Sequence, residues 1–539
     1  MSELSAPPDQ AQMVRELLAA LINQGRIADA SELFESLKGA LPDDPQLKVY
    51  ESYVHLRLGR NEEAIQCVSQ ALALGSGDPL TLLVLGSASL NLGAHADAAQ
   101  ALLAAHRASP QHLEAACLLL EAAVAAYGFE EAQAIYEEAA ARLPGSAAAT
   151  TWARLLFDAG RFGEMPDGFV AKPVGTVSAW LKGRGAAPAW VGEREIIPSR
   201  TPPVFGEPKP TDEVVQVPGY VPYAATVPDA TIFSKSTVIV TPDVNLLSDT
   251  MADERFGRFL AFNHDRRVVR NAERALYDTR AAGLMELDAA VMLSGWTTDY
   301  YGHWVPEYLC RLSYLEHHPR FADLPIVVDA GMPVQHLEYL RLLVPNPVVE
   351  LPRDHALRCR ELLVGGPSTF FPTHVVPDHQ VPNDYMGGLP VGGFRYLQER
   401  VAAKLPPTGR SGRKLYLGRK SRNWRRVVNE DEIAAALAAE GFEILYPETM
   451  SFEDQVRMYQ EASVVVAPGG SAVLNAVFAR TDFRFVILSQ RNLFNWATYY
   501  GLMRELGYEM TMLCGEQGND EKHSDFEIPI SQVLQAVRG

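Results

Sequence analysis

The chain has 539 residues, of which 47% are hydrophobic and 21% charged, and its formal net charge is -18. This composition is typical of a soluble globular protein, and the length suits about three domains of roughly 150 residues each. The acidic balance argues against a nucleic-acid backbone or an anionic lipid surface as the main partner, although it leaves room for a local basic pocket.

The cysteines and the N-terminus carry information on the compartment. Five cysteines are scattered without a Cys-x-x-Cys spacing, which fits a reducing compartment better than a disulfide framework. The first ten residues are polar, with neither the basic nor the apolar segment of a secretory signal. No apolar run approaches the ~18 residues that a membrane span needs. We therefore expect a cytoplasmic protein without a membrane span.

A repeat runs through residues 11–163. Ala30, Ala64, Ala98 and Ala132 are spaced by 34 residues, and each follows a short turn that contains glycine. This stretch resembles the tetratricopeptide family, whose helix pairs stack into an α-solenoid with a concave groove because no pair can bury its own apolar stripe. The resemblance implies a groove that binds a protein or peptide; self-association into a homo-oligomer is the alternative.

Residues 164–230 form a proline-rich connector with eleven prolines. Proline lacks a backbone N–H, so this density excludes long helices and central strands. The aromatic content is too high for a disordered tether. We expect an irregular segment that packs on the surface of a domain, with strands only at sheet edges.

Residues 231–405 alternate apolar runs with helical stretches. Strands are expected at 237–240, 289–295, 324–329, 348–351 and 361–365, and helices at 256–276, from near His303 to about His317, and at 336–343. The alternation implies a parallel, doubly wound sheet, in which ligands bind beyond the carboxyl ends of the strands. The loop 295–303 follows one such end.

Three titratable residues in and after this loop are candidates for acid–base chemistry. His303 and Glu307 are four residues apart and share one face of a helix start, where the positive end of the helix favours a neutral imidazole. A neutral His303 can take a proton from a hydroxyl, with Glu307 orienting it or acting in its place; Asp299 is a further candidate. The alternative is structural, with Glu307 paired to Arg311. The pattern is not that of a zinc site.

Residues 406–539 repeat the alternation. Strands are expected at 414–417, 442–446, 464–466, 485–488 and 509–513, and helices at 430–440, 451–462, 472–479 and 495–506. This is a second Rossmann-like unit. Its Gly469-Gly470 turn follows the third strand and not the first, which counts against a dinucleotide-dependent oxidoreductase.

Two features of this unit favour an anion. After the strand 464–466, the turn Gly469-Gly470 and the helix-capping Ser471 aim backbone N–H groups at one point, where glycine lets a phosphate approach closely. The loop 418–426 carries five cations after the first strand. We predict that its guanidinium groups clamp phosphate, with lysine as a point charge. The residues of this clamp are Arg419, Lys420 and Arg422. A plain turn and a solvated loop are the alternatives.

Together these motifs resemble glycosyltransferase family 61, which contains plant xylosyl- and arabinosyltransferases and animal O-linked N-acetylglucosaminyltransferases. The resemblance covers about residues 285–490. The matching residues are Tyr300-Tyr301-Gly302-His303-Trp304 with Glu307, Tyr416-Leu417-Gly418-Arg419, Arg425-Arg426, Asn429-Glu430, Gly441-Phe442-Glu443, Pro447-Glu448, Ser451-Phe452 with Gln455, and Ala467-Pro468-Gly469-Gly470-Ser471 with Asn475.

The resemblance implies a GT-B fold, an inverting reaction and a UDP-sugar donor. Residues 231–405 would be the acceptor domain and residues 406–539 the nucleotide-sugar domain, and Glu448 and Asn475 would join the donor-binding residues. The family usually has His-Gly-Ala where this chain has Gly469-Gly470-Ser471. This departure removes an imidazole, while the backbone N–H groups of the turn remain.

The sequence as a whole predicts an α-solenoid followed by an α/β glycosyltransferase that acts on a protein or glycan acceptor. No Asp-x-Asp occurs in the chain. We therefore expect neither an essential metal nor a cofactor besides the nucleotide-sugar co-substrate. The alternative is a transferase-like scaffold that has lost activity and acts through its repeats.

Overall fold

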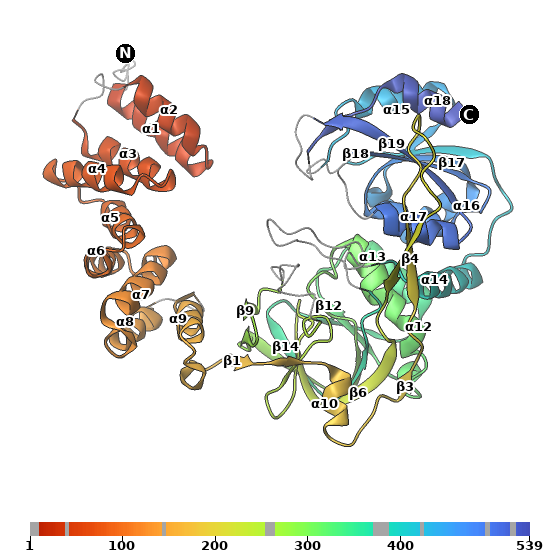
Figure 1. Cartoon of the computed structure of the whole chain (residues 1–539), viewed down its shortest axis with the longest axis horizontal. Coiled ribbons are helices and arrows are strands. Elements are labelled where there is room, and N and C mark those ends of the chain that lie inside the picture. Colours follow the sequence, from red (N-terminus) through yellow and green to blue (C-terminus); the bar gives the residue numbers. More distant parts are fainter. Residues whose placement is uncertain are drawn as a thin grey trace, which may run out of the picture. The chain divides into compact units, whose positions relative to one another are not determined.

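The computed structural model describes residues 10–37, 43–142, 147–253, 265–369, 388–420, 425–490, 496–517 and 524–538. The chain divides into two compact units, Met1–Ala171 and Lys172–Gly539. The first unit is built of helices and the second is built on sheets with helices around them (Figure 1). None of the described helices is long and apolar enough to cross a membrane.

The first unit is a succession of helices of similar length. They are α1 (Gln10–Asn23), α2 (Ile27–Ser36), α3 (Pro45–Arg57), α4 (Asn61–Ala73), α5 (Pro79–Asn91), α6 (His95–Ala108), α7 (Leu113–Tyr127), α8 (Phe129–Arg142) and α9 (Ala147–Asp158). Asp44 and Asp78 cap α3 and α5, each followed by proline at the first helical position. The four alanines of the 34-residue period are fully buried, as helix-to-helix contact requires. The predicted α-solenoid is confirmed.

The second unit contains a nine-stranded mixed sheet, which with its helices is called the N-lobe here. The strands run in the order β13-β12-β11-β14-β6-β7-β8-β2, and β3 also pairs with β6. Their bounds are β2 (Val174–Gly175), β3 (Trp190–Val191), β6 (Tyr223–Phe233), β7 (Ile239–Val240), β8 (Leu246–Leu247), β11 (Gly283–Met292), β12 (Ile326–Asp329), β13 (Val348–Leu351) and β14 (His355–Gly365). The expected parallel array is limited to β13, β12, β11 and β14, because β14-β6-β7-β8 are antiparallel. At the far edge, β2 pairs in parallel with β8.

The strand β6 corrects the prediction for the connector, because it is a central strand inside a proline-rich stretch. Pro228 lies opposite Glu361 of β14. On its other edge, β6 pairs with β3 at residues 223–224 and with β7 at residues 231–232. Pro228 thus falls between these two stretches, where β6 has only one partner strand in the described chain, and a missing N–H is tolerated there.

The helix predicted at 256–276 is also wrong in the part that the structure describes; residues 254–264 lie outside it. β9 (Val268–Asn271) and β10 (Ala275–Asp278) form an antiparallel pair. Leu276 and Tyr277 are consecutive and both buried. A β-branched pair in β9 and this burial outweigh the helical spacing of the apolar residues.

A six-stranded sheet, with its helices, forms the C-lobe. The order is β16-β15-β17-β18-β19-β20, with β15 to β19 parallel and β20 antiparallel at the edge. The strands are β15 (Arg413–Leu417), β16 (Glu443–Leu445), β17 (Ala462–Pro468), β18 (Arg484–Gln490), β19 (Glu509–Gln517) and β20 (Phe526–Glu527). The five predicted strands are confirmed. The helices are α15 (Glu430–Ala439), α16 (Phe452–Glu461), the 3-10 helix η7 (Ser471–Phe478), α17 (Trp496–Glu505) and α18 (Ile530–Arg538).

The two lobes share one apolar core. Tyr339 of α13 (Val334–Leu343) stacks on Phe452 of α16 with ring centroids 3.9 Å apart, and it meets Phe478 edge-on at 5.9 Å. Trp304 and Phe485 belong to the same buried cluster. Buried apolar residues of both lobes thus belong to one cluster within the second compact unit.

Candidate functional site

The chain reverses its direction of travel through the C-lobe sheet between β15 and β17. From β15 it moves outward to β16, and it then returns to the other side of β15 as β17. A crevice forms beyond the carboxyl ends of two such strands, because the connections leave in opposite directions. Arg419 follows β15 and the Gly469-Gly470 turn follows β17, so the sheet brings the two predicted anion-binding segments together.

Arg419 lies directly against the glycine turn. Its Nη2 donates a hydrogen bond to Gly469 O. A Cβ placed on Gly470 would overlap the same Nη2, so a larger residue at position 470 would displace the guanidinium from this position. The backbone of Gly470 is extended, with φ -176, and its glycine therefore serves this close approach and not a turn conformation.

A cavity of about 310 Å³ opens at this point and is called the switch-point pocket here. Its lining residues are Leu417, Gly418, Arg419, Arg425, Pro447, Glu448, Ala467, Pro468, Gly470, Ser471, Ala472 and Val473. Burial, with the charge of Arg425 beside it, lowers the pKa of Arg419 to about 10, and burial also lowers the pKa of Arg425. Two desolvated guanidinium groups in one pocket favour an anionic ligand, which would offset their repulsion.

Arg425 is a residue that the sequence analysis counted in the basic loop without assigning it to the site. Its φ is 53, a conformation that costs a residue with a side chain about 1–3 kcal/mol. Its buried Nε has no hydrogen-bond acceptor within the described ranges. Strain together with an unmet donor marks Arg425 as part of the pocket. Neither feature is visible in the sequence, because both depend on the fold.

The remaining donor-site predictions have mixed outcomes. Glu448 Oε1 accepts a hydrogen bond from Lys420 N, so this carboxylate holds the basic loop in place. The Lys420 ammonium lies 5.4 Å from the centre of the Tyr446 ring. Arg422 lies outside the described residues.

The turn itself differs from the prediction in two details. Gly470, and not Ser471, is the N-cap, and the helix that follows is a 3-10 helix. Gly469 N donates a hydrogen bond to Leu488 O of β18 at 2.7 Å, so this amide is used in the sheet and does not point at a ligand. Ser471 and Ala472 open the helix, and their N–H groups have no intrahelical acceptor. These two residues line the switch-point pocket.

Asn475 does not line the pocket. The residue is 1% exposed and is not among those that line the pocket. Asn475 Oδ1 accepts a hydrogen bond from Tyr301 OH at 2.5 Å, and Nδ2 donates to Gln455 Oε1 at 2.9 Å. The predicted donor contact of Asn475 therefore has no support in this arrangement.

Gly469, where the resemblance leads one to expect histidine, faces a bulky neighbour. A Cβ at this position would overlap Cζ2 of Trp496, whose Nε1 donates to Ser489 Oγ at 2.9 Å. The indole thus occupies the volume that a side chain at position 469 would need. A glycine at position 469 is therefore the residue that fits beside this indole.

Restoring the family residue should therefore destabilise this protein. We expect Gly469→His to lower the free energy of unfolding by about 1–3 kcal/mol through overpacking against Trp496. Chemical denaturation measures the loss, and adding Trp496→Ala should recover part of it. A Gly469→His variant as stable as the wild type would contradict the packing argument.

The acid–base candidates lie at the start of an irregular helix in the N-lobe. One turn of α11 (Tyr301–His303) leads into a π-helix, η2 (Trp304–Tyr308), then a 3-10 turn, η3 (Leu309–Arg311), and α12 (Leu312–Leu315). The single helix predicted from near His303 to about His317 is thus broken into several pieces. Pro306 lacks the N–H that a regular α-helix would use, and π-turns of this kind are frequent at functional sites.

His303 and Glu307 form a pair inside this segment. His303 Nδ1 lies 2.9 Å from Glu307 Oε1. Glu307 Oε2 accepts a hydrogen bond from Thr297 Oγ1 at 3.3 Å, and the Glu307 side chain is buried. Arg311 instead lies over the Tyr308 ring, 5.0 Å from its centre, so the alternative pairing of Glu307 with Arg311 is not observed.

Asp299 lies in a different environment from Glu307. Its Oδ2 is 3.2 Å from Lys235 Nζ, and its side chain is 45% exposed. A solvated ion pair of this kind contributes little to stability and does not orient an imidazole. Of the three candidates, the structure therefore brings His303 and Glu307 together and leaves Asp299 apart.

Two residues that the sequence analysis did not select hold the preceding loop. The buried Asp329 ends β12 and accepts hydrogen bonds from Ser294 Oγ, Gly295 N, Thr298 Oγ1 and Lys235 N. His336 Nδ1 lies 2.9 Å from Thr298 O, and burial lowers the pKa of His336 to about 4. The sequence feature that could have identified Asp329 is its position as an acidic residue at the end of a predicted strand.

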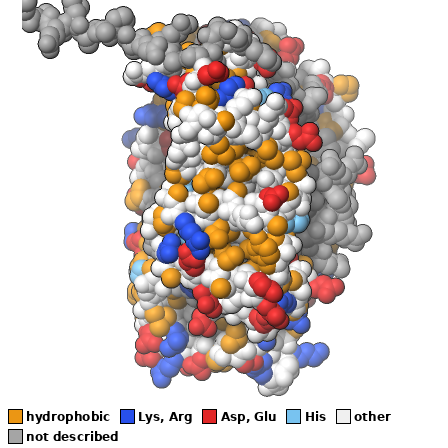
Figure 2. Space-filling model, turned by 90° about the vertical axis from the view of Figure 1, so that its left-hand side faces the viewer, with side chains coloured by type: hydrophobic (Ala, Val, Ile, Leu, Met, Phe, Trp, Pro, Cys, Tyr) orange, Lys and Arg blue, Asp and Glu red, His pale blue; other side chains and the backbone are white. Residues whose placement is uncertain are grey.

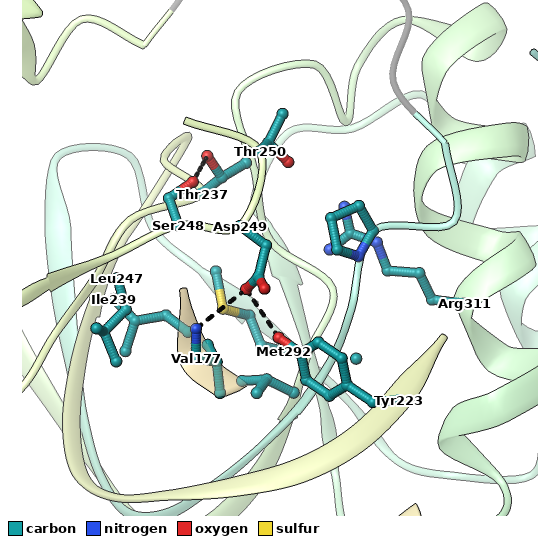
Figure 3. A pocket seen from close by; sticks show the side chains of 13 residues that line it. Val177, Tyr223, Thr237, Ile239, Leu247, Ser248, Asp249, Thr250, Met292 and Arg311 are labelled. Carbon is teal, nitrogen blue, oxygen red and sulfur yellow. Dashed lines mark hydrogen bonds between the residues drawn. The ribbon is translucent and has the colours of Figure 1, made fainter. Parts of the chain in front are cut away.

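A second cavity lies within the N-lobe (Figure 3). Asp249 accepts hydrogen bonds there from Tyr223 OH at 2.8 Å and from Val177 N at 3.4 Å, and Arg311 faces it. Its volume is about 30 Å³. That space suits about one water molecule, so this cavity is not a substrate site.

Glu51, His55 and Cys67 of the first unit form the only grouping of potential metal ligands found in the described part of the chain, with ligand atoms within 4.8 Å of one another. Lys48 Nζ lies 2.7 Å from Glu51 Oε2. This ammonium opposes a second cation, and we assign no metal here.

A two-lobed α/β body with a cationic pocket at a switch point, joined to a helical repeat, is consistent with a glycosyltransferase fold. Residues 301–486 match the family model described as Glycosyltransferase 61, and residues 51–112 match that described as Tetratricopeptide repeat. The chain therefore contains a glycosyltransferase 61 domain and an N-terminal tetratricopeptide repeat, as predicted. The comparison with curated proteins gives no match.

Several solved structures are similar to part of the chain, each with a TM-score of 0.25. A MamA double mutant of RS-1 is 17% identical, with 29% of this chain and 87% of that chain covered. A thermophilic tetratricopeptide protein of Thermus thermophilus is 21% identical, with 29% and 86% covered. A MamA fragment from Desulfovibrio magneticus RS-1 is 17% identical, with 29% and 88% covered.

Proposed function

We propose that this protein is an inverting glycosyltransferase that moves a sugar from a nucleotide-sugar, with UDP as the expected nucleotide, to a hydroxyl of a protein or glycan acceptor. The observation that carries the proposal is the convergence of Arg419 with the 469–471 turn at one pocket of the glycosyltransferase domain. The pocket volume also falls within the range of small-molecule sites.

The switch-point pocket supplies what a departing diphosphate requires. Arg419 and Arg425 offer guanidinium forks, and Ser471 and Ala472 offer N–H groups at a positive helix end. Such preorganised donors stabilise charge as it develops on the leaving group. Because these cations neutralise the diphosphate, we propose that the transfer needs no divalent metal.

The His303–Glu307 pair would activate the acceptor. With Nδ1 held by Glu307, His303 would use Nε2 to take the acceptor proton. The acceptor oxygen then bonds to the anomeric carbon while the bond from that carbon to the diphosphate oxygen breaks with its electron pair. This single displacement inverts the anomeric configuration.

The repeats would recruit the acceptor or a partner protein in the cytoplasm. In Figure 2, hydrophobic side chains gather along the middle of one face, with charged side chains around them. Exposed large hydrophobic residues of the first unit include Leu17, Leu58, Leu72, Leu92 and Leu113. Contiguous exposed apolar surface marks interaction sites.

A thermal-shift screen of nucleotide-sugars tests donor binding directly. A ligand at 100 times its Kd stabilises the native state by about 2.7 kcal/mol, so a matching donor should raise the Tm by several degrees. UDP should give a shift in the same direction, and uridine, which lacks the diphosphate, should give none. If no nucleoside diphosphate or nucleotide-sugar raised the Tm, the proposed donor pocket would be refuted.

A second candidate function is a nucleotide-sugar-binding scaffold without turnover. It is favoured by Trp496, which excludes the family histidine from position 469. The two functions separate in one assay, because a scaffold would show the thermal shift with neither transfer nor hydrolysis of the donor.

A further inference from the structure

We propose that Asn475 is a positioning residue, the hub of a buried hydrogen-bond chain that fixes the His303 segment of the N-lobe to the wall of the switch-point pocket in the C-lobe. The chain runs from Tyr301 through Asn475 and Gln455 to Pro447. The inference rests on the proposed function for its consequence in catalysis, while the chain itself is a property of the fold.

The chain is continuous, and each of its bonds has hydrogen-bond geometry. Tyr301 OH donates to Asn475 Oδ1 at 2.5 Å, and Asn475 Nδ2 donates to Gln455 Oε1 at 2.9 Å. Gln455 Nε2 then donates to Pro447 O at 2.9 Å. Tyr301 stands two residues before His303, and Pro447 lines the pocket. These hydrogen bonds thus connect the proposed base to the proposed donor site.

Every bond in this chain runs in the same direction. Each amide accepts at its carbonyl and donates from its NH₂, and Tyr301 supplies the first proton donor. Burial raises the pKa of Tyr301, so its hydroxyl remains protonated. Asn475 and Gln455 are both buried, which leaves little access for water to replace a lost partner. Buried chains of this kind are rigid when complete and costly when one bond is missing.

Close packing reinforces the chain at the same place. A Cβ on Gly302 would stand 3.2 Å from the Ser471 Cβ, so the backbone between Tyr301 and His303 lies against the first residue of η7. The Tyr301 ring also lies beside His336, with ring centroids 5.3 Å apart. The segment that carries His303 is therefore held on one side by its own lobe and on the other by the donor turn.

The residues of the chain do not offer their side chains to the pocket. Tyr301, Gln455 and Asn475 are absent from its lining, and Pro447 takes part in the chain through its carbonyl oxygen. Breaking this hydrogen-bond chain should therefore misplace the base relative to the donor while leaving the donor contacts in place. The signature of this role is a loss in kcat without a matching loss in donor affinity.

Tyr301→Phe removes one hydroxyl and keeps the ring, and Tyr300→Phe is its matched control because Tyr300 is the neighbouring residue and is 56% exposed. We expect Tyr301→Phe to lower kcat at least tenfold with donor Kd, by calorimetry with the nucleotide-sugar, within about twofold of the wild type. Tyr300→Phe should match the wild type in both. An equal loss of kcat and of donor affinity in Tyr301→Phe, or no loss of either, would overturn the inference.

Hydrogen exchange tests the chain without any substrate. In Tyr301→Phe, amide exchange should rise both in residues 299–308 of the N-lobe and in residues 468–476 of the C-lobe, and in Tyr300→Phe it should rise in neither. Unchanged exchange in 468–476 of Tyr301→Phe would overturn the inference. A wild-type protein without transferase activity would refute the proposed function, but the exchange result would still decide the inference.

Discussion

Replacing Arg419 with alanine should weaken donor binding by about 10- to 100-fold. A hydrogen bond to a charged group contributes about 1.5–3 kcal/mol, and every 1.4 kcal/mol is tenfold in Kd. The substitution would remove such a bond to the diphosphate. It would also remove the hydrogen bond from Arg419 to Gly469 O, so the turn next to the donor would become less rigid. Calorimetry with UDP and with the matching nucleotide-sugar measures the loss.

The controls for this substitution come from the same loop. Arg426 bonds Asp525 and its side chain is 56% exposed, so Arg426→Ala should leave donor binding unchanged. Arg419→Lys keeps the charge without the planar fork and should fall between alanine and the wild type. Unaltered binding in Arg419→Ala would remove the guanidinium clamp from the proposal.

Arg419→Ala should not unfold the protein. Arg419 is partly buried in the same pocket as Arg425, which lowers the pKa of Arg419, so its removal relieves a repulsion that offsets the lost bond to Gly469. We expect a Tm close to that of the wild type without ligand, and a greatly reduced shift when the donor is added. The pair of measurements separates loss of binding from loss of fold.

The C-lobe was predictable because its strands are buried on both faces. Parallel strands of this kind appear as continuous apolar runs between turn residues, and the runs near Leu415, Val465 and Ile487 gave each strand its place. The N-lobe was harder to predict. Pro228 led us to predict no central strand where β6 is found, and the spacing of apolar residues before Tyr277 led us to predict a helix where β9 and β10 are found. At Pro228, pairing of β6 with the distant strand β14 outweighed the local signal, and before Tyr277, pairing of β10 with its neighbour β9 did so.

The site was predictable only at the level of segments. The glycine turn and the basic loop could be located because their composition is unusual, and a parallel sheet brings successive strand ends to one edge. Which side chain enters the pocket depends on backbone conformation and on neighbours far along the chain. Arg425 enters through a left-handed φ, and Asn475 is turned away by Tyr301, which lies 174 residues earlier.

Replacing His303 with alanine should lower turnover by about 10²-fold or more and leave donor affinity near that of the wild type. General-base catalysis contributes about 10²–10⁴-fold, and His303 is the imidazole that Glu307 orients. Because His303 does not line the switch-point pocket, its removal should not disturb the diphosphate contacts. Single-turnover transfer rates and donor calorimetry together measure the two effects.

Substitutions of the other two candidates, Glu307 and Asp299, test whether His303 is the base. Glu307→Gln keeps the shape and can still contact His303 Nδ1, but it removes the charge that stabilises an imidazolium, so turnover should fall less than in His303→Ala. Asp299→Asn, which breaks only a solvated pair with Lys235, should be close to the wild type. A large loss in Asp299→Asn with full activity in His303→Ala would transfer the role of base to the exposed carboxylate, and the π-turn would then be left with a structural role alone.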